Sequence, residues 1–232
     1  MDPSALVGLR PLIGEARFST YLHHYQGNEA LALRLYSWNI AASTALWGPL
    51  GVLEVTLRNA INAKMRDRAG REDWWGSPTT YLMERERRII ESAIGKLEVR
   101  GNSNPSADDV VAATSFGLWT GLTSEGLPRH STLSYETTYW QPRLRHAFPH
   151  YGPPAKRKQL HRLLDDIRQI RNRIAHHEPI FKSDLSKVCD NIAVVAGYVS
   201  PEAEQYIRDS HRVDVVLAAK VDFVSVGSGC HF

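Results

Sequence analysis

The residues best suited to chemistry lie together, between Arg171 and Pro179. His176 and His177 follow the arginine by five and six positions, and Asn172 lies directly beside it. An imidazole can take or give a proton near neutral pH, and a guanidinium can bind two phosphate oxygens and stabilise charge that develops on them. These residue types therefore indicate phosphodiester cleavage without a metal ion, with Asn172 orienting either group or a ribose hydroxyl.

A long helix must position these groups. Apolar residues recur upstream at three- and four-residue spacing, which is the pattern of one buried helical face: Leu160, Leu163, Leu164, Ile167, Ile170 and Ile174. Pro179 should end this helix, because proline disfavours helical geometry in the residue before it and has no N–H to donate.

The helix raises a geometric difficulty. Arg171 lies roughly 140° from His176 and roughly 120° from His177 around a regular helix, so the groups do not share a face. Either the last turn distorts ahead of Pro179, or two copies of the helix face each other. We favour the second, because a two-fold contact repeats the same patch and doubles the site. The alternative without chemistry is that these side chains only cap the helix end.

Several stretches resemble one protein family. The pattern Arg171-Asn172-x3-His176 is similar to the Arg-polar-x3-His signature of HEPN domains, which are helical bundles found in many bacterial RNases. Residues 171–180 resemble the Abi-like (abortive infection) branch of that superfamily. Further blocks that resemble it are residues 35–39, 53–61, 115–119 and 140–142, and together the blocks extend over roughly residues 15–182.

The resemblance implies an all-α, HEPN-like helical bundle with additional flanking helices, assembled as a homodimer with a composite site. It implies a metal-independent endoribonuclease of a phage-defence or toxin–antitoxin system, without a cofactor, in which Arg171 and His176 are the catalytic pair. Attack by a ribose 2′-hydroxyl would leave a 2′,3′-cyclic phosphate, and His177 could take the second proton-transfer role. The expected partners are RNA and, for a toxin, a protein or RNA antitoxin.

Positive charge is concentrated around this helix. Residues 143–177 contain nine Lys or Arg and two Asp, a net +7 in a chain whose total is +3, so the rest carries −4. Such a segment suits contact with a phosphate backbone, although a solvated helix face is equally compatible with it. The candidate RNA-binding residues are Lys156, Arg157, Lys158, Arg168 and Arg173, together with Arg58 and Asn59, which the resemblance places near the cleft.

Composition suits a protein with a proper core, since 43% of its 232 residues are hydrophobic. We expect a helical domain over residues 1–200, then a C-terminal helix and a tail. No apolar run reaches the ~18 residues of a membrane span, and no secretory signal is recognised. Two cysteines are too few for a disulfide framework and lack metal-site spacing. The expected location is the cytoplasm.

The sequence also predicts the order of the elements. Helices are expected at residues 14–25, 29–68 with a kink or break at Gly48-Pro49, 77–100, 106–122, 135–148, 155–178, 183–199 and 200–216. Residues 1–10 should be a loose lead-in, and 221–232 either disordered or a short edge strand. Trp38 and Trp47 are expected in the core, and at least one of Trp74 and Trp75 on the surface.

A second function class fits the same residues. The basic helix could hold a small structured RNA without cutting it, or act as a scaffold in a defence complex, with the histidines serving structure. Salt-sensitive binding without cleavage would mark this non-catalytic RNA-binding module.

Overall fold

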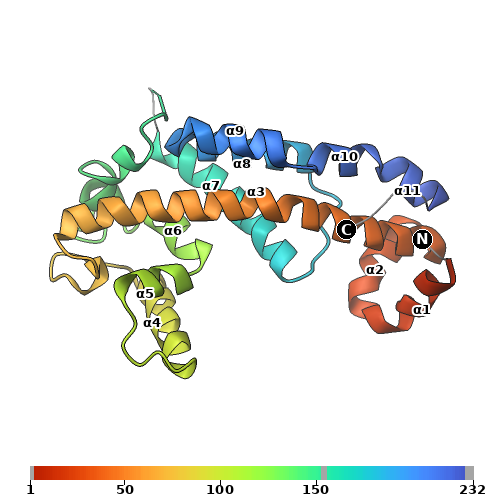
Figure 1. Cartoon of the computed structure of the whole chain (residues 1–232), viewed down its shortest axis with the longest axis horizontal. Coiled ribbons are helices and arrows are strands. Elements are labelled where there is room, and N and C mark those ends of the chain that lie inside the picture. The colour runs from red at the N-terminus through yellow and green to blue at the C-terminus, as the bar shows by residue number, and fades with distance from the viewer. Residues whose placement is uncertain (1–2, 153–155, 228–232) are drawn as a thin grey trace. The chain divides into compact units, whose positions relative to one another are not determined.

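The computed structural model of the chain describes residues 3–152 and 156–227. Every regular element in these ranges is helical, and extended backbone pairs within them in one isolated bridge, between Gly126 and Ser134. The predicted all-α class is therefore confirmed for the described part of the chain. The elements in chain order (Figure 1) are α1 (Pro3–Ile13), α2 (Glu15–His24), α3 (Glu29–Ala69), η1 (Trp74–Gly76), α4 (Glu84–Val99), α5 (Ala107–Ala113), α6 (Phe116–Leu122), η2 (Glu136–Trp140), η3 (Leu144–Ala147), α7 (Arg157–Ala175), α8 (Leu185–Val199), α9 (Pro201–Ser210), α10 (Val213–Ala218) and α11 (Lys220–Val226).

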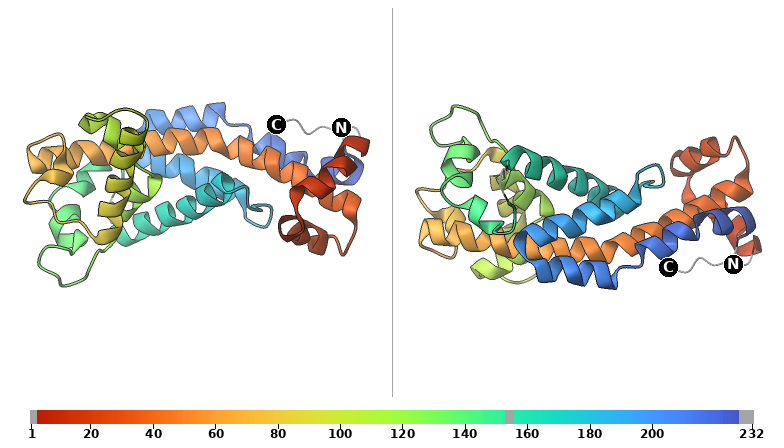
Figure 2. Two further views of the ribbon diagram at one scale, coloured as in Figure 1. Left: turned by 90° about the horizontal axis from the view of Figure 1, so that it is seen from below. Right: turned by 90° about the horizontal axis from the view of Figure 1, so that it is seen from above.

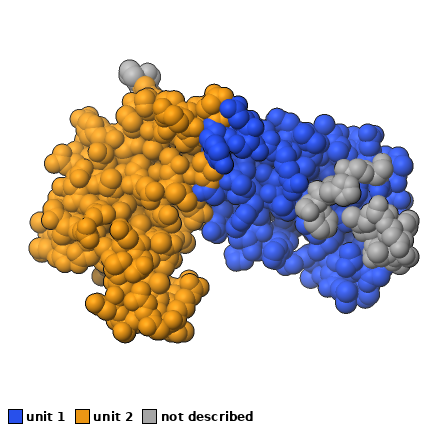
Figure 3. All heavy atoms as spheres, viewed as in Figure 1, with its two compact units in different colours: residues 1–51, 169–193, 206–232 blue, residues 52–168, 194–205 orange. Residues whose placement is uncertain are grey.

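These elements form two compact units (Figure 3). Unit 1 comprises residues 1–51, 169–193 and 206–232, and unit 2 comprises residues 52–168 and 194–205. Helices α3, α7, α8 and α9 each supply residues to both units. The predicted boundary after residue 200, between a helical domain and a C-terminal helix with its tail, stays a prediction.

Helix α3 is the longest element, with 41 residues. Its buried stripe is the one that the apolar spacing predicts, with Leu35, Trp38, Leu53 and Leu57 each at most 1% exposed. Gly48-Pro49 does not divide it into two helices, since Pro49 lies inside one continuous element. Proline removes one main-chain hydrogen bond, and side-chain packing on both sides of it compensates.

The stretch Glu29–Gly76 is also long and apolar enough, by length and composition alone, to cross a membrane. Of its most apolar window, 44% is buried inside the structure, and the core helix of a soluble protein has the same features.

Both ends of the described chain are helical within unit 1. Residues 3–13 form α1 rather than the predicted loose lead-in, and α1 contacts α2, with which it lies side by side in Figure 2. At the other end, the predicted strand or disordered tail is wrong for residues 220–226, which form α11. Residues 228–232 of that predicted tail lie outside the described residues.

Hydrogen bonds from α3 hold the C-terminal helices of unit 1. The indole Nε1 of Trp38 donates to the carbonyl of Val216 at 2.9 Å. The Arg34 guanidinium donates to the carbonyls of Ser225 at 2.6 Å and Val224 at 3.3 Å. These bonds satisfy carbonyls at the C-terminal ends of α10 and α11, which have no partner within their own helices. This tertiary partner explains why a segment that reads as a loose tail is helical.

In unit 2, α4 begins later than predicted. Ser77 was expected to cap the helix, but Glu84 is its first residue. The main-chain N–H groups of Tyr81 and Met83 donate instead to the hydroxyls of Tyr139 at 2.9 Å and Tyr135 at 2.7 Å. These distant tyrosines keep the segment out of the helix, and sequence spacing does not reveal them.

The predicted helix over residues 106–122 is two helices. Its start is confirmed, because Ser106 and Asp109 form a capping box at α5. The helix stops at Ala113, where the Thr114 hydroxyl donates to the carbonyl of Val111 at 2.7 Å. Threonine hydroxyls compete in this way for helix carbonyls, and the extended backbone of Thr114 then leads into α6.

Glu86 is a buried carboxyl in unit 2, with 2% of its surface exposed. It accepts a hydrogen bond from the Tyr135 hydroxyl at 3.1 Å. A Cβ at Gly121 would lie 2.4 Å from its Oε1, so only glycine leaves room for this carboxyl. The pKa of Glu86 is raised, mainly because burial disfavours the charged carboxylate.

Stability should therefore depend on pH through Glu86. A carboxyl whose pKa is raised by folding contributes stability that is present at acid pH and is lost as pH rises through the folded pKa. We expect Glu86→Gln to gain stability relative to the parent as pH rises from about 4 to about 8. Urea unfolding across that range measures the difference.

Glu84 supplies a matched control on the same helix. Its pKa is lowered, first by a hydrogen bond from Arg88 and then by the charge of Arg87. Its contribution to stability is therefore present above the unfolded pKa and is lost as pH falls. Glu84→Gln should accordingly lose a small amount of stability relative to the parent as pH rises, the opposite of the trend for Glu86→Gln. Parallel trends in the two variants would contradict the assignment for Glu86.

Candidate functional site

The stretch predicted to be catalytic leaves α7 through a tight turn. The helix ends at Ala175, four residues before Pro179. The N–H of His177 donates to the carbonyl of Ile174 at 3.0 Å, and that of Glu178 donates to the carbonyl of Arg173 at 2.8 Å. This pair of bonds is the Schellman motif, which satisfies carbonyls at a helix C-terminus. The chain thus departs from helical geometry ahead of Pro179, which is one of the two geometries that the sequence left open, and the facing of two copies stays a prediction.

His177 occupies the left-handed position of that turn, with φ at 55°. Glycine is the usual residue there, because a Cβ crowds the backbone in this conformation. A non-glycine residue in this region costs on the order of 1 kcal/mol, and such strain is concentrated at functional sites. The turn therefore holds an imidazole at a position where the backbone conformation alone would favour glycine.

His177 lines a pocket of about 800 Å³ that lies entirely in unit 1, here named the Trp47 pocket. Helix α3 supplies most of its wall, α2 supplies one arginine, and the end of α7 supplies the rest. The lining residues are Arg17, Tyr36, Asn39, Ile40, Ser43, Thr44, Trp47, Gly48, Ile174, Ala175 and His177. This volume lies within the range of small-molecule and cofactor sites.

Asn39 fixes the turn against α3. Its side-chain oxygen accepts hydrogen bonds from the main-chain N–H groups of Ile180 at 2.8 Å and Phe181 at 3.1 Å. Asn39 is 4% exposed, so these bonds lie in the interior, where an unsatisfied N–H would be costly. The chain is thereby held immediately after Pro179, and with it the position of His177 at the pocket.

Arg17 is a candidate site residue that the sequence did not reveal. Its Nη2 donates to the main-chain carbonyl of His176 at 3.3 Å, and the side chain lines the Trp47 pocket. Arg17 is an exposed arginine in a short helix, 159 positions from its partner. Nothing in the sequence around such an arginine indicates that it belongs to a site.

Trp47 lies open in the pocket, with 49% of its surface exposed. The prediction that Trp47 is core is wrong, whereas Trp38 is buried as expected, at 1% exposure. Both residues belong to the same apolar stretch of α3, which is why periodicity groups them. The Arg171 guanidinium lies over the Trp47 ring, with its carbon 5.8 Å from the ring centroid. The indole therefore connects Arg171 to the pocket that His177 lines.

The remaining predicted residues of unit 1 surround the turn without lining the pocket. His176 is exposed, and its main-chain N–H donates to the carbonyl of Asn172 at 2.9 Å. Asn172 is half-buried. Arg173 is exposed, with its Nε 3.7 Å from a carboxylate oxygen of Glu178. The structure thus brings His177 rather than His176 to the pocket.

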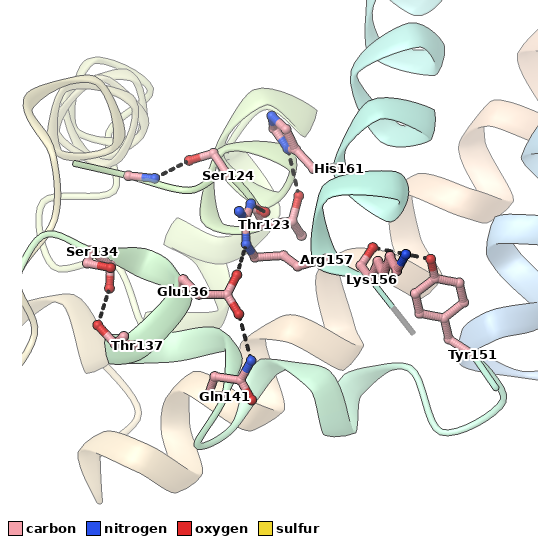
Figure 4. A network of polar contacts seen from close by, with 11 residues as sticks. Thr123, Ser124, Ser134, Glu136, Thr137, Gln141, Tyr151, Lys156, Arg157 and His161 are labelled. Atoms are coloured by element: carbon pink, nitrogen blue, oxygen red, sulfur yellow. Dashed lines mark hydrogen bonds and ion pairs between the residues drawn. The ribbon is translucent and has the colours of Figure 1, made fainter. Parts of the chain in front are cut away.

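In unit 2, Arg157 is buried, and groups of the protein itself occupy its guanidinium (Figure 4). It is 8% exposed, it pairs through Nε with Glu136, and its Nη1 donates to the carbonyl of Thr123 at 2.9 Å. The Thr123 hydroxyl lies 3.0 Å from Nδ1 of His161, and burial lowers the pKa of that histidine. This setting argues against the predicted role of Arg157 as an RNA contact.

The other predicted RNA contacts of unit 2 differ in exposure. Lys156, Lys158 and Asn59 are exposed, and Arg58 and Arg168 are half-buried. Arg168 donates two hydrogen bonds, at 2.7 and 2.9 Å, to the carboxylate three positions earlier. Their role in binding RNA stays a prediction.

Comparisons with protein-family models, with curated proteins and with solved structures find no significant match to this chain. Within the described ranges, no group of three or more His, Cys, Asp or Glu side chains is arranged to hold a metal ion.

The strain at His177 generates a stability prediction. We expect His177→Gly to raise the free energy of unfolding by up to about 1 kcal/mol, because glycine adopts the left-handed conformation without a Cβ clash. For a chain of this size, that change corresponds to a melting temperature higher by about 2–4 °C. Differential scanning calorimetry measures it.

The neighbouring position is the matched control. His176 lies outside the left-handed region, so His176→Gly should be neutral or destabilising. A His177→Gly variant that melts below the parent would show that the imidazole contributes more to stability than the strained backbone costs.

Proposed function

We propose that this chain is a metal-independent endoribonuclease whose reaction takes place at the mouth of the Trp47 pocket, with His177 as the principal catalytic residue. We propose further that it acts in the cytoplasm, in a phage-defence or toxin–antitoxin system. One observation carries the proposal. A strained turn places an imidazole at a pocket that Arg17 also lines, and the guanidinium of Arg171 lies over the pocket's tryptophan.

The proposed chemistry assigns one role to each group. His177 takes the proton from a ribose 2′-hydroxyl, whose oxygen attacks the adjacent phosphorus. Arg171 and Arg17 bind the phosphate oxygens and stabilise the charge that builds on them. The bond from phosphorus to the 5′-oxygen breaks, and His176 gives that oxygen its proton. The products carry a 2′,3′-cyclic phosphate and a 5′-hydroxyl, so no water and no redox partner is consumed.

Asn172 and the basic side chains complete the proposed site. Asn172, next to Arg171 on α7, would orient the guanidinium or a ribose hydroxyl. Arg173 is exposed beside the turn, where RNA phosphate could displace its weak, solvent-screened pair with Glu178. The exposed lysines at 156 and 158 remain proposed contacts to the backbone of a longer RNA.

We propose that the chain forms a homodimer and, for a toxin, that a protein or RNA antitoxin silences it. The composite site predicted from the sequence was favoured because a regular helix separates Arg171 from the histidines. Within one chain, however, His177 lines the Trp47 pocket and Arg171 lies over its tryptophan, so a second copy is not needed to bring them to one pocket. Light scattering on the RNA-free chain tests the assembly, and a mass of one chain across the concentrations used in the cleavage assay would contradict the homodimer.

Cleavage in EDTA is the direct test. Purified chain should cut single-stranded RNA in EDTA and leave 2′,3′-cyclic phosphate ends, which end-group analysis identifies. His177→Ala should lower the rate by about 10²–10⁴-fold, the usual contribution of a general acid or base. The exposed His23 is the matched control, and His23→Ala should cleave at the parental rate.

Two results would contradict the proposal. Loss of cleavage in EDTA would show that a metal ion is required, and unchanged cleavage by His177→Ala would remove the central residue. Tight, salt-sensitive binding of RNA that is never cut would instead establish the non-catalytic RNA-binding module.

A further inference from the structure

We infer that the Trp47 pocket holds one unpaired base of the RNA, stacked on Trp47 and recognised by Asn39. This inference rests on the proposed ribonuclease function and deepens it, because it names the part of the substrate that the site recognises. Three features of the pocket support it, namely the open indole, the polar groups of the wall and the charges at the rim.

The open indole is unusual within this protein. Four of the six tryptophans are at most 3% exposed, namely Trp38, Trp74, Trp119 and Trp140. Trp47 keeps 49% of its surface exposed although it lines a pocket beside the apolar side chains of Ile40 and Ile174. A flat ring beside aliphatic walls provides a stacking platform for a base, and RNA-binding proteins use aromatic side chains in this way.

The polar groups of the wall have fixed hydrogen-bonding roles. The Asn39 oxygen is occupied by two main-chain N–H groups, so its amide nitrogen is the part of the side chain left to donate. The Ser43 hydroxyl donates to the carbonyl of Asn39 at 2.8 Å, and the Thr44 hydroxyl donates to the carbonyl of Ile40 at 3.0 Å. Toward the pocket these two hydroxyls therefore act as acceptors. The Watson–Crick edge of every base carries both donors and acceptors, so this wall can hydrogen-bond an unpaired base.

The rim carries the groups that a phosphate needs. Arg17 and His177 line the pocket, and the Arg171 guanidinium lies over the ring of Trp47. A base held on Trp47 would thus have its phosphate near cations and an imidazole. A base inside a duplex is stacked and paired and cannot enter, so the substrate presents an unpaired nucleotide.

The probe for this inference is an oligoribonucleotide of about six nucleotides with 2′-O-methyl groups, which binds but has no 2′-hydroxyl to attack. The reporter is the fluorescence of Trp47 in the full chain carrying Trp75→Leu. Trp75 is the other solvent-accessible tryptophan among the described residues, and its removal leaves Trp47 as the accessible indole there.

We expect the single-stranded probe to quench Trp47, and its duplex to bind at least about 10-fold more weakly. Trp47→Leu should weaken binding by about 5- to 150-fold, the range measured for loss of one base–aromatic stack. Trp47→Phe should retain most of the affinity, and Trp75→Leu alone should bind like the parent. Because Trp47 is half-exposed, its replacement should leave the fold intact.

Asn39 has a separate readout. Asn39→Asp keeps an oxygen for the two main-chain N–H groups but replaces the donating amide nitrogen with an acceptor. It should change the order of affinity among probes that differ at one base, whereas Trp47→Phe should keep that order, because stacking tolerates any base.

The outcomes separate this inference from the ribonuclease proposal. Equal binding of single strand and duplex, with Trp47→Leu like the parent, would overturn the base pocket even if the chain cuts RNA in EDTA. Quenching and stacking-dependent binding, without cleavage of unmodified RNA, would support the base pocket and overturn the ribonuclease.

Discussion

The chain leaves α7 through a turn, and the buried amide of Asn39 captures it only a few residues later. Two main-chain N–H groups, those of Ile180 and Phe181, converge on one side-chain oxygen. Breaking that contact would leave N–H groups buried without a partner, at a cost of roughly 1–3 kcal/mol each. The position of His177, the wall of the Trp47 pocket and the contact from Arg17 all depend on this anchor.

The anchored turn explains how a helix end can act as a site. A regular helix would have spread Arg171 and the two histidines around its circumference. By ending at Ala175 and turning through a left-handed residue, the chain brings His177 to the lining of the pocket, whereas His176 does not line it. The strain is local, and the contacts around the turn maintain it, as is common where geometry serves function.

Much of the fold could be predicted from the sequence, because the spacing of apolar residues within a helix indicates which of its faces is buried. The stripes of α3 and α7 and the cap at Ser106 follow from spacing and residue type alone. The late start of α4 could not be predicted, because it depends on hydroxyls of Tyr135 and Tyr139 more than 50 positions away.

The site was predictable only in its residue types. The proposed chemistry follows from the stretch at 171–179. The choice between the two histidines does not, because glycine is the usual sign of a left-handed turn and here the residue is His177. Trp47 was misassigned because the apolar period of α3 continues across the open pocket. The burial of Arg157 could not be predicted, because its partner, Glu136, lies 21 positions away.

The most direct test of the central claim follows the His177 ring itself while RNA binds. The imidazole C–H resonances can be recorded by NMR during titration with an RNA blocked at its 2′-hydroxyls, and the His177→Ala variant assigns the signal. The account predicts that the His177 resonances shift until the RNA saturates the chain, while those of the exposed His23 stay in place. Saturable RNA binding that leaves the His177 resonances unmoved would contradict it.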